Sequence, residues 1–188
     1  MNCLKFFIIS FFCVVPASAN ENIEDVKIFT KGVVKLISEK KWEDFSKFIH
    51  PKEGVKFSPY TYVRKTAVTL NSEQFLDLTK NKKKLSWDFY EGSGDPIQIN
   101  FNEYYEEFLY KLPYAQAKPG KPNEEQTTIG STINNIPEVF SGEGVLTVQF
   151  FIQKDKVELH NSGGLTIVLK KDQEKLYVIG LVNCYWAP

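Results

Sequence analysis

Cysteine is scarce in this sequence of 188 residues, and its scarcity excludes two kinds of stabilisation. Cys3 and Cys13 lie in an N-terminal segment that we expect to be removed, so Cys184 remains alone. A single cysteine forms no disulfide within its own chain and supplies no cysteine cluster for a metal ion. The domain must therefore be held together by packing, and we expect Cys184 to be a small buried residue of the last strand.

Histidine is equally rare, since His50 and His160 are its two occurrences. Neither histidine has an acidic residue at the spacing of zinc ligands, so we expect no metal site and no cofactor. The chain also lacks a Gly-x-Ser-x-Gly elbow, and nothing around Cys184 is typical of a catalytic thiol. These absences favour a protein that is not an enzyme.

The chain also has no excess of positive or of negative charge. The chain has 23 basic and 23 acidic residues, and without Lys5 the balance is 22 to 23, a net charge of −1. A near-neutral chain without a basic cluster lacks the electrostatic footprint of a nucleic-acid-binding protein. We therefore expect no nucleic-acid partner, but an unknown small molecule or a protein of the cell envelope.

Long apolar runs are absent outside the N-terminus. Residues 1–19 combine one charge, Lys5, with an apolar run over residues 6–15 and the small residues 17–19. This pattern is typical of a secretory signal peptide, and the run is about half of the roughly 20 residues that a membrane span needs. We expect an exported protein, periplasmic or secreted, with no transmembrane segment after cleavage. Residues 20–188 then have the length of a single domain.

Helical periodicity marks the first part of the remaining chain. Apolar residues recur at helical spacing over residues 22–38 and again over residues 41–49. Pro51 ends the helical pattern, because proline pushes the residue before it out of the α region. Gly54 then permits a turn, so we expect residues 50–63 to fold the helices back over a sheet.

Two capping boxes predict further short helices. Asn71 has Gln74 three residues later, and Asn100 has Glu103 at the same spacing. In each pair the first side chain bonds a backbone amide of the first turn and the second bonds back. We expect one helix after Asn71 and another after Asn100.

Alternating apolar and polar residues predict strands in much of the rest of the chain. The expected strands cover residues 66–70, 85–90, 97–101, 145–152, 165–169 and 176–182. Residues 113–137 show no periodicity, and we expect a long loop that is mobile or functional, because such loops are rare in compact domains. The order of elements predicts an α+β fold, with the N-terminal helices packed on a curved antiparallel sheet.

Several short stretches carry a resemblance to known proteins. They are His50-Pro51, residues 54–60, residues 87–97, Tyr104-Tyr105 with Phe108, and residues 177–182 before Trp186. On these residues the chain resembles the NTF2-like (cystatin-like) α+β folds, and more narrowly a family of uncharacterised exported bacterial proteins and lipoproteins. The resemblance implies a cone whose sheet wraps around a pocket closed by the N-terminal helices. In those relatives a His-Asp pair precedes the final tryptophan, whereas this chain has Asn183 and Cys184 there.

His50 and Asp88 are the candidate catalytic residues. His50 ends a predicted helix, where a histidine either acts as an acid or base near neutral pH or caps the last carbonyls; we expect the cap. Asp88 lies on the strand face opposite its neighbours Trp87 and Phe89. If that face lines a pocket, burial raises the pKa of Asp88 and suits it to acid-base chemistry. We expect instead that Asp88 faces water.

The candidate ligand-binding residues are tyrosines: Tyr60, Tyr62, Tyr90 and Tyr104. Each can offer a hydroxyl to a ligand or an aromatic face to a sugar, but a tyrosine is more often part of the core with its hydroxyl satisfied at the edge.

Two functional hypotheses from different classes follow. The first is an exported, non-enzymatic domain that binds a ligand or an envelope partner in a pocket or on a concave sheet face. The alternative is a pocket enzyme using His50 and Asp88 as an acid-base pair, which requires both to converge on one cavity. A third hypothesis places a docked partner on residues 113–137, unless that loop packs over the cavity as a lid.

Overall fold

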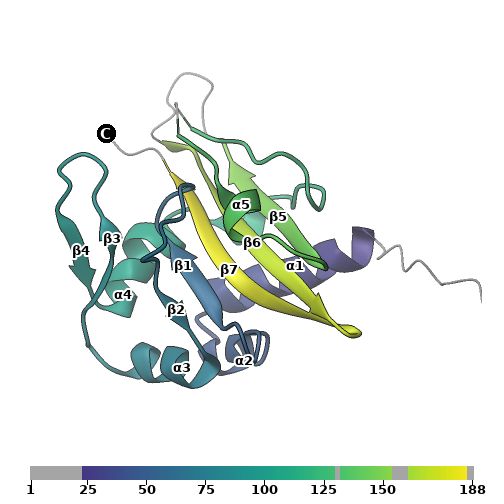
Figure 1. Ribbon diagram of the computed structural model, residues 1–188, viewed down its shortest axis with the longest axis horizontal. Coiled ribbons are helices and arrows are strands. Elements are labelled where there is room, and N and C mark those ends of the chain that lie inside the picture. The colour runs from purple at the N-terminus through teal and green to yellow at the C-terminus, as the bar shows by residue number, and fades with distance from the viewer. Residues whose placement is uncertain (1–22, 130–131, 154–160, 186–188) are drawn as a thin grey trace, which may run out of the picture.

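A computed structural model gives the structure of residues 23–129, 132–153 and 161–185 (Figure 1). The helices are α1 (Ile23–Ser38), α2 (Trp42–Ser46), α3 (Ser72–Lys80), α4 (Phe101–Tyr104), the π-helix η1 (Tyr105–Leu109), the 3-10 helix η2 (Tyr114–Gln116) and α5 (Ile136–Val139). The strands are β1 (Val55–Ser58), β2 (Thr69–Leu70), β3 (Leu85–Phe89), β4 (Pro96–Ile99), β5 (Val145–Ile152), β6 (Gly163–Asp172) and β7 (Lys175–Tyr185). The expected signal peptide, residues 1–19, and His160 lie outside the described residues.

The main sheet has the strand order β2-β1-β7-β6-β5. Strands β5, β6 and β7 form an antiparallel meander, and Figure 1 shows the two long strands β6 and β7 bending along their length. Strand β1 pairs with β7 in parallel, with Lys56 opposite Gly180. The predicted α+β fold with a curved, mostly antiparallel sheet is therefore confirmed. The parallel pairing of β1 with β7 was not predicted, because the alternation of residues along one strand does not specify the direction of its partner.

Helix α1 covers one face of this sheet, as the apolar spacing of residues 22–38 predicted. Its residues Val26, Val33 and Ile37 are buried in a core shared with β1, β5, β6 and β7. Helix α2 is shorter than the predicted 41–49, because the backbone after it leaves the helix to bond with β7: the Val178 amide donates to the Phe48 carbonyl at 2.7 Å. Among the described residues, none of the helices is both long and apolar enough to span a bilayer.

Aromatic rings occupy the space between the N-terminal helices and the sheet. Phe57 of β1, Phe75 of α3 and Phe101 of α4 are completely buried, with ring centroids 5.3 to 6.3 Å apart. Such edge-to-face and stacked contacts add stability beyond the buried area itself. The part of the cone around Phe57, where the resemblance implied a pocket, is thus core.

The opposite face of the sheet is covered by α5 and its flanks, which Figure 1 shows in front of β6. Ile136 and Phe140 form a second core with Val168, Ile179 and Val182 of β6 and β7. Strands β6 and β7 are consequently buried on both faces, and their apolar residues run almost without interruption.

The described part of the loop 113–137 lies along β5. The amides of Gly120 and Asn123 donate to the carbonyls of Gln149 and Thr147, both at 2.8 Å. This loop therefore satisfies polar groups at the exposed edge of the sheet, which would otherwise offer a template for another strand. These bonds fix the described part of the loop on the edge of the sheet, and a partner docked there stays a prediction.

Strands β3 and β4 form a separate hairpin with a β-bulge. Ser86 pairs with Gln98 and Phe89 with Pro96, so Trp87 and Asp88 together oppose Ile97. The extra residue turns Asp88 inward beside Trp87, and it leaves Phe89 43% exposed. The expectation that Asp88 faces water is therefore wrong.

Both predicted capping boxes are confirmed. Asn71 accepts from the Gln74 amide and Gln74 bonds back at the start of α3. Asn100 and Glu103 do the same at the start of α4. The second box positions α4 and η1, which carry Tyr104 and Phe108 of the site described next.

Candidate functional site

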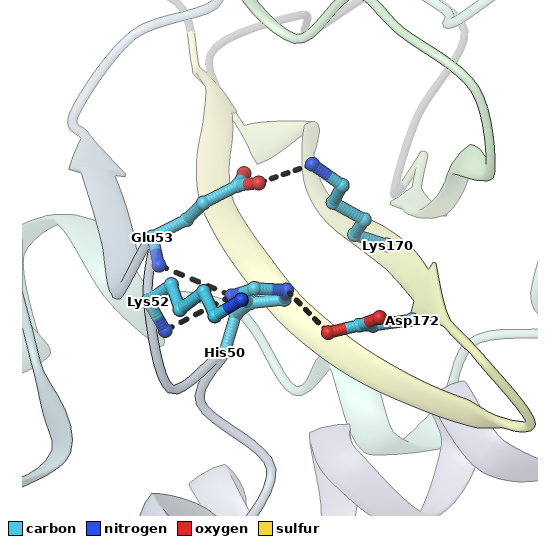
Figure 2. A network of polar contacts seen from close by, with 5 residues as sticks. All are labelled: His50, Lys52, Glu53, Lys170 and Asp172. Carbon is cyan, nitrogen blue, oxygen red and sulfur yellow. Dashed lines mark hydrogen bonds and ion pairs between the residues drawn. The ribbon is translucent and has the colours of Figure 1, made fainter.

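The structure separates the predicted site residues into two places, and His50 occupies one of them alone. Its side chain is 3% exposed, and Nδ1 accepts hydrogen bonds from the amides of Lys52 and Glu53 at 3.2 and 3.1 Å (Figure 2). The expectation that His50 bonds the last carbonyls of a helix is therefore wrong, since its ring closes the following turn instead.

The far side of the His50 ring faces the β6–β7 hairpin. Nε2 lies 3.8 Å from Asp172 Oδ2 and has no hydrogen-bond partner. The centroids of the His50 and Tyr177 rings are 5.3 Å apart, and the two rings are steeply inclined to each other. Glu53 pairs with Lys170 beside it, as Figure 2 shows. Because Nδ1 accepts from two amides, the proton of the neutral ring sits on Nε2, toward the carboxylate. These contacts connect the turn at residues 50–53 to the β6–β7 hairpin.

Asp88 lies in the second place and is buried with an arginine partner. Arg64 Nε donates to Asp88 Oδ1 at 2.8 Å, and the Phe89 amide donates to the same oxygen at 2.8 Å. The other oxygen, Oδ2, is buried without a partner. Burial raises the pKa of the Asp88 carboxyl, and the Phe89 amide and the Arg64 charge oppose that rise.

Tyr104 and Tyr60 adjoin this carboxylate. Tyr104 is fully buried, stacks on Trp87 at 3.9 Å, and leaves its hydroxyl without a hydrogen-bond partner. Burial, then the charge of Asp88, raises the pKa of Tyr104 well above its ordinary value. Burial also raises the pKa of Tyr60 to about 12, against a backbone hydrogen bond from Glu91 that lowers it.

The other two tyrosines lie further out. The Tyr90 ring is 6.1 Å from Phe108, which also contacts Tyr60 and Tyr104 at 5.9 and 5.5 Å. Tyr62 is 41% exposed, and its ring centroid is 5.9 Å from the Arg64 guanidinium carbon. The structure thus brings Tyr60, Tyr90 and Tyr104 together around Phe108, with Tyr62 beyond Arg64.

Three residues of this place were not predicted from the sequence: Arg64, Glu91 and Phe108. Burial and the charge of Asp88 raise the pKa of Glu91, while the charge of Arg64 lowers it. A signal for Arg64 existed, because it is the one arginine in a chain with 22 lysines. We call the group of Tyr60, Tyr62, Arg64, Asp88, Phe89, Glu91 and Tyr104 the Arg64 site.

His50 and Asp88 do not converge. Ile49, next to His50, pairs with Val178 on β7, whereas Thr61, near Tyr60, bonds the Asn183 carbonyl at 3.4 Å. Five residues of strand separate those two points, which is roughly 16 Å. The contacts of His50 and those of Asp88 share no residue, so the hypothesis of an acid-base pair made by these two is wrong.

Asn183 and Cys184 replace the His-Asp pair that the resemblance would place near the C-terminus. Asn183 accepts from the Tyr114 hydroxyl at 3.4 Å and donates to the Phe108 carbonyl of η1. Cys184 is 2% exposed and points to the opposite face, with Sγ 3.2 Å from the Thr127 carbonyl. Burial raises the pKa of the Cys184 thiol. Its predicted place as a buried residue of the last strand is confirmed.

In residues 23–129, 132–153 and 161–185, no three His, Cys, Asp or Glu side chains lie close enough together to bind a metal ion. The chemistry that the Arg64 site does offer is recognition. It presents a carboxylate oxygen and a phenol hydroxyl that lack partners, next to aromatic faces and one guanidinium.

Comparison with known proteins adds little to this geometry. No family model matches the chain, and no curated protein matches it. Among solved structures, the chain is similar to a Xanthomonas campestris protein described provisionally as a calcium/calmodulin dependent protein kinase II association domain. The two share 13% identity over 92% of this chain and 93% of the other, with a TM-score of 0.37. A likeness at that level carries no functional argument, so the assignment of the fold rests on the elements and strand order described above.

Proposed function

We propose that this chain is an exported domain that binds a small ligand at the Arg64 site. The observation that carries the proposal is the pair of buried atoms without partners, Asp88 Oδ2 and the Tyr104 hydroxyl. Buried polar groups in folded proteins are hydrogen-bonded in the great majority of cases, because leaving one unpaired costs about 1–3 kcal/mol. Two such atoms in one part of the structure are a place where a ligand can supply the missing hydrogen bonds.

Binding fits the site better than catalysis does. Asp88 keeps free lone pairs on Oδ2, but the bonds from Arg64 and the Phe89 amide to Oδ1 stabilise the charged carboxylate and make it a weaker base. No second titratable side chain is hydrogen-bonded to Tyr104 to activate its hydroxyl. The exposed rings of Tyr62 and Phe89 give the site the aromatic faces that ligand sites share.

The proposal of export rests on the sequence of residues 1–19, with its apolar run and small residues at the expected cleavage point. Cell fractionation of the full-length chain and mass measurement of the product test this part. The expected product begins at Asn20 in the periplasm or the medium, and a cytoplasmic product of full mass would contradict it.

Native mass spectrometry of the protein purified from that compartment tests the binding itself. We expect an additional small-molecule mass on the wild type, lost in Tyr104→Phe, which removes one hydroxyl and preserves the ring. Tyr105→Phe is the matched control, because Tyr105 is similarly buried but stacks on Tyr110 at 5.7 Å, away from Asp88. A bound mass that survives Tyr104→Phe, or a wild type that carries and accepts no ligand, would contradict the proposal.

A further inference from the structure

Arg64 lies in surroundings that recognise a positive charge. Its guanidinium carbon is 5.9 Å from the ring centroids of both Tyr62 and Phe89, and its Nε bonds Asp88 at 2.8 Å. A cation flanked by aromatic faces above a carboxylate is a favourable arrangement, and guanidinium suits it because it is planar and only weakly hydrated. The chain places its single arginine here and uses lysine everywhere else.

The pairing between Arg64 and Asp88 is incomplete. An arginine that is fixed on a carboxylate commonly bonds both oxygens through two parallel N–H groups. Here only Oδ1 is used, and Oδ2 stays buried and unpaired. The Arg64 side chain is also 43% exposed while that of Asp88 is 1% exposed. The guanidinium therefore lies on the solvent side of Asp88 and leaves the buried Oδ2 without a partner.

The charges of the site favour a second cation. Asp88 and Glu91 supply two carboxylates against the single charge of Arg64. Burial raises the pKa of Glu91; the charge of Arg64 lowers it and the charge of the nearby Asp88 raises it. An added cation offsets these carboxylate charges, whereas an anion would meet two carboxylates, one of them buried.

Building on the proposed function, we propose that the Arg64 site binds an organic cation, whose ammonium or guanidinium group donates to Asp88 Oδ2. Arg64 is the built-in cation at Asp88, and it moves away from Oδ1 as the ligand enters. The ligand cation then has the unpaired carboxylate oxygen and the Tyr104 hydroxyl as its inner partners. The step is an exchange of ion pairs, and no covalent bond forms or breaks.

Titration with ethylguanidinium chloride, followed by the NMR shift of the Phe89 amide, tests the inference, because that amide bonds Asp88. N-ethylurea, of the same shape without the charge, is the ligand control. We expect the wild type to bind ethylguanidinium and not N-ethylurea. Arg64→Ala should bind ethylguanidinium at least about tenfold more tightly, equivalent to about 1.4 kcal/mol, because the internal competitor is gone.

Lys65→Ala is the matched variant, since it removes one positive charge from the neighbouring exposed position without touching Asp88. It should bind ethylguanidinium as the wild type does, whereas Arg64→Ala combined with Asp88→Asn should not bind. Arg64→Gln serves as a second variant if Arg64→Ala does not fold, which its NMR spectrum reveals directly. Equal binding of ethylguanidinium and N-ethylurea, or no gain in either Arg64 variant, would overturn the inference.

The two proposals fail separately. If mass spectrometry finds a neutral or anionic ligand that Tyr104→Phe loses, the binding function stands and the cation inference falls. If neither a retained ligand nor a cation binds, both fall, and water is then the partner of the two buried atoms.

Discussion

The contact between Gly180 of β7 and Phe140 gives a quantitative test of how the chain covers its own sheet. A Cβ atom added to Gly180 would lie 2.6 Å from Phe140 Cζ and 2.8 Å from Cε1, closer than side chains approach. The Phe140 ring therefore sits in a place that only glycine leaves open. Substituting Gly180→Ala must displace that ring, and with it the segment that leads from α5 to β5.

The expected cost follows from the packing. Overfilling a tight core costs typically about 1–3 kcal/mol, so Gly180→Ala should lower the free energy of unfolding by that amount. Phe140→Ala should cost about 3 kcal/mol, the lower end for a buried phenylalanine, because its side chain keeps 8% exposure. In the Phe140→Ala background, Gly180→Ala should cost almost nothing. Alanine is favoured over glycine in a strand by about 0.5–1 kcal/mol, which offsets the contact that remains with Val168 at 3.0 Å.

Urea denaturation of the wild type, both single variants and the double variant completes the cycle. We expect a coupling energy of about 1–3 kcal/mol between the two positions, since the clash exists only when both side chains are present. If Gly180→Ala destabilises both backgrounds equally, Phe140 does not occupy this place, and the described cover of the outer face is wrong.

Three further predictions concern the polar contacts. Asn135→Ala should cost about 1–3 kcal/mol and speed hydrogen exchange of the Val63 amide, because the Asn135 side chain bonds both the amide and the carbonyl of that buried residue at 2.7 and 3.0 Å. Asp88→Asn should be more stable than the wild type at neutral pH, as urea denaturation measures. Burial raises the pKa of Asp88 in the folded state, so protonation of Asp88 stabilises the folded protein. This stabilisation is fully present below the unfolded-state pKa and is lost as the pH rises through the folded-state pKa. The wild type and Asp88→Asn should therefore have similar stability in acid. His50→Ala should cost about 1–2 kcal/mol by removing the acceptor of two turn amides, and His50→Asn should recover part of this in thermal melts, because its side-chain oxygen accepts similar bonds.

Local signals in the sequence were enough to predict most of the elements. The apolar spacing that begins near Ile23 is a helix, and both capping boxes form with the predicted partners. Each of these signals lies within one continuous stretch of the chain, so no distant contact is needed to recognise it.

The site could not be read in the same way. Strict alternation around Trp87 predicted Asp88 outside, and one extra residue in the hairpin moved it inside. A bulge depends on how two strands fit together, and neither strand encodes it alone. Arg64 went unnoticed because its partner lies 24 positions further along the chain, although its uniqueness in the composition was visible.

The parallel pairing of β1 with β7 has a consequence for the way the chain acquires its structure. Lys56 pairs with Gly180, so the strand that follows the first helices is completed by a segment 124 positions further along the chain. Such distant contacts slow folding, because a long stretch of chain must be ordered before they form. Strand β1 and the core beneath α1 therefore depend on β7, and deleting residues 175–185 should unfold α1 and β1 as well as removing the final strand.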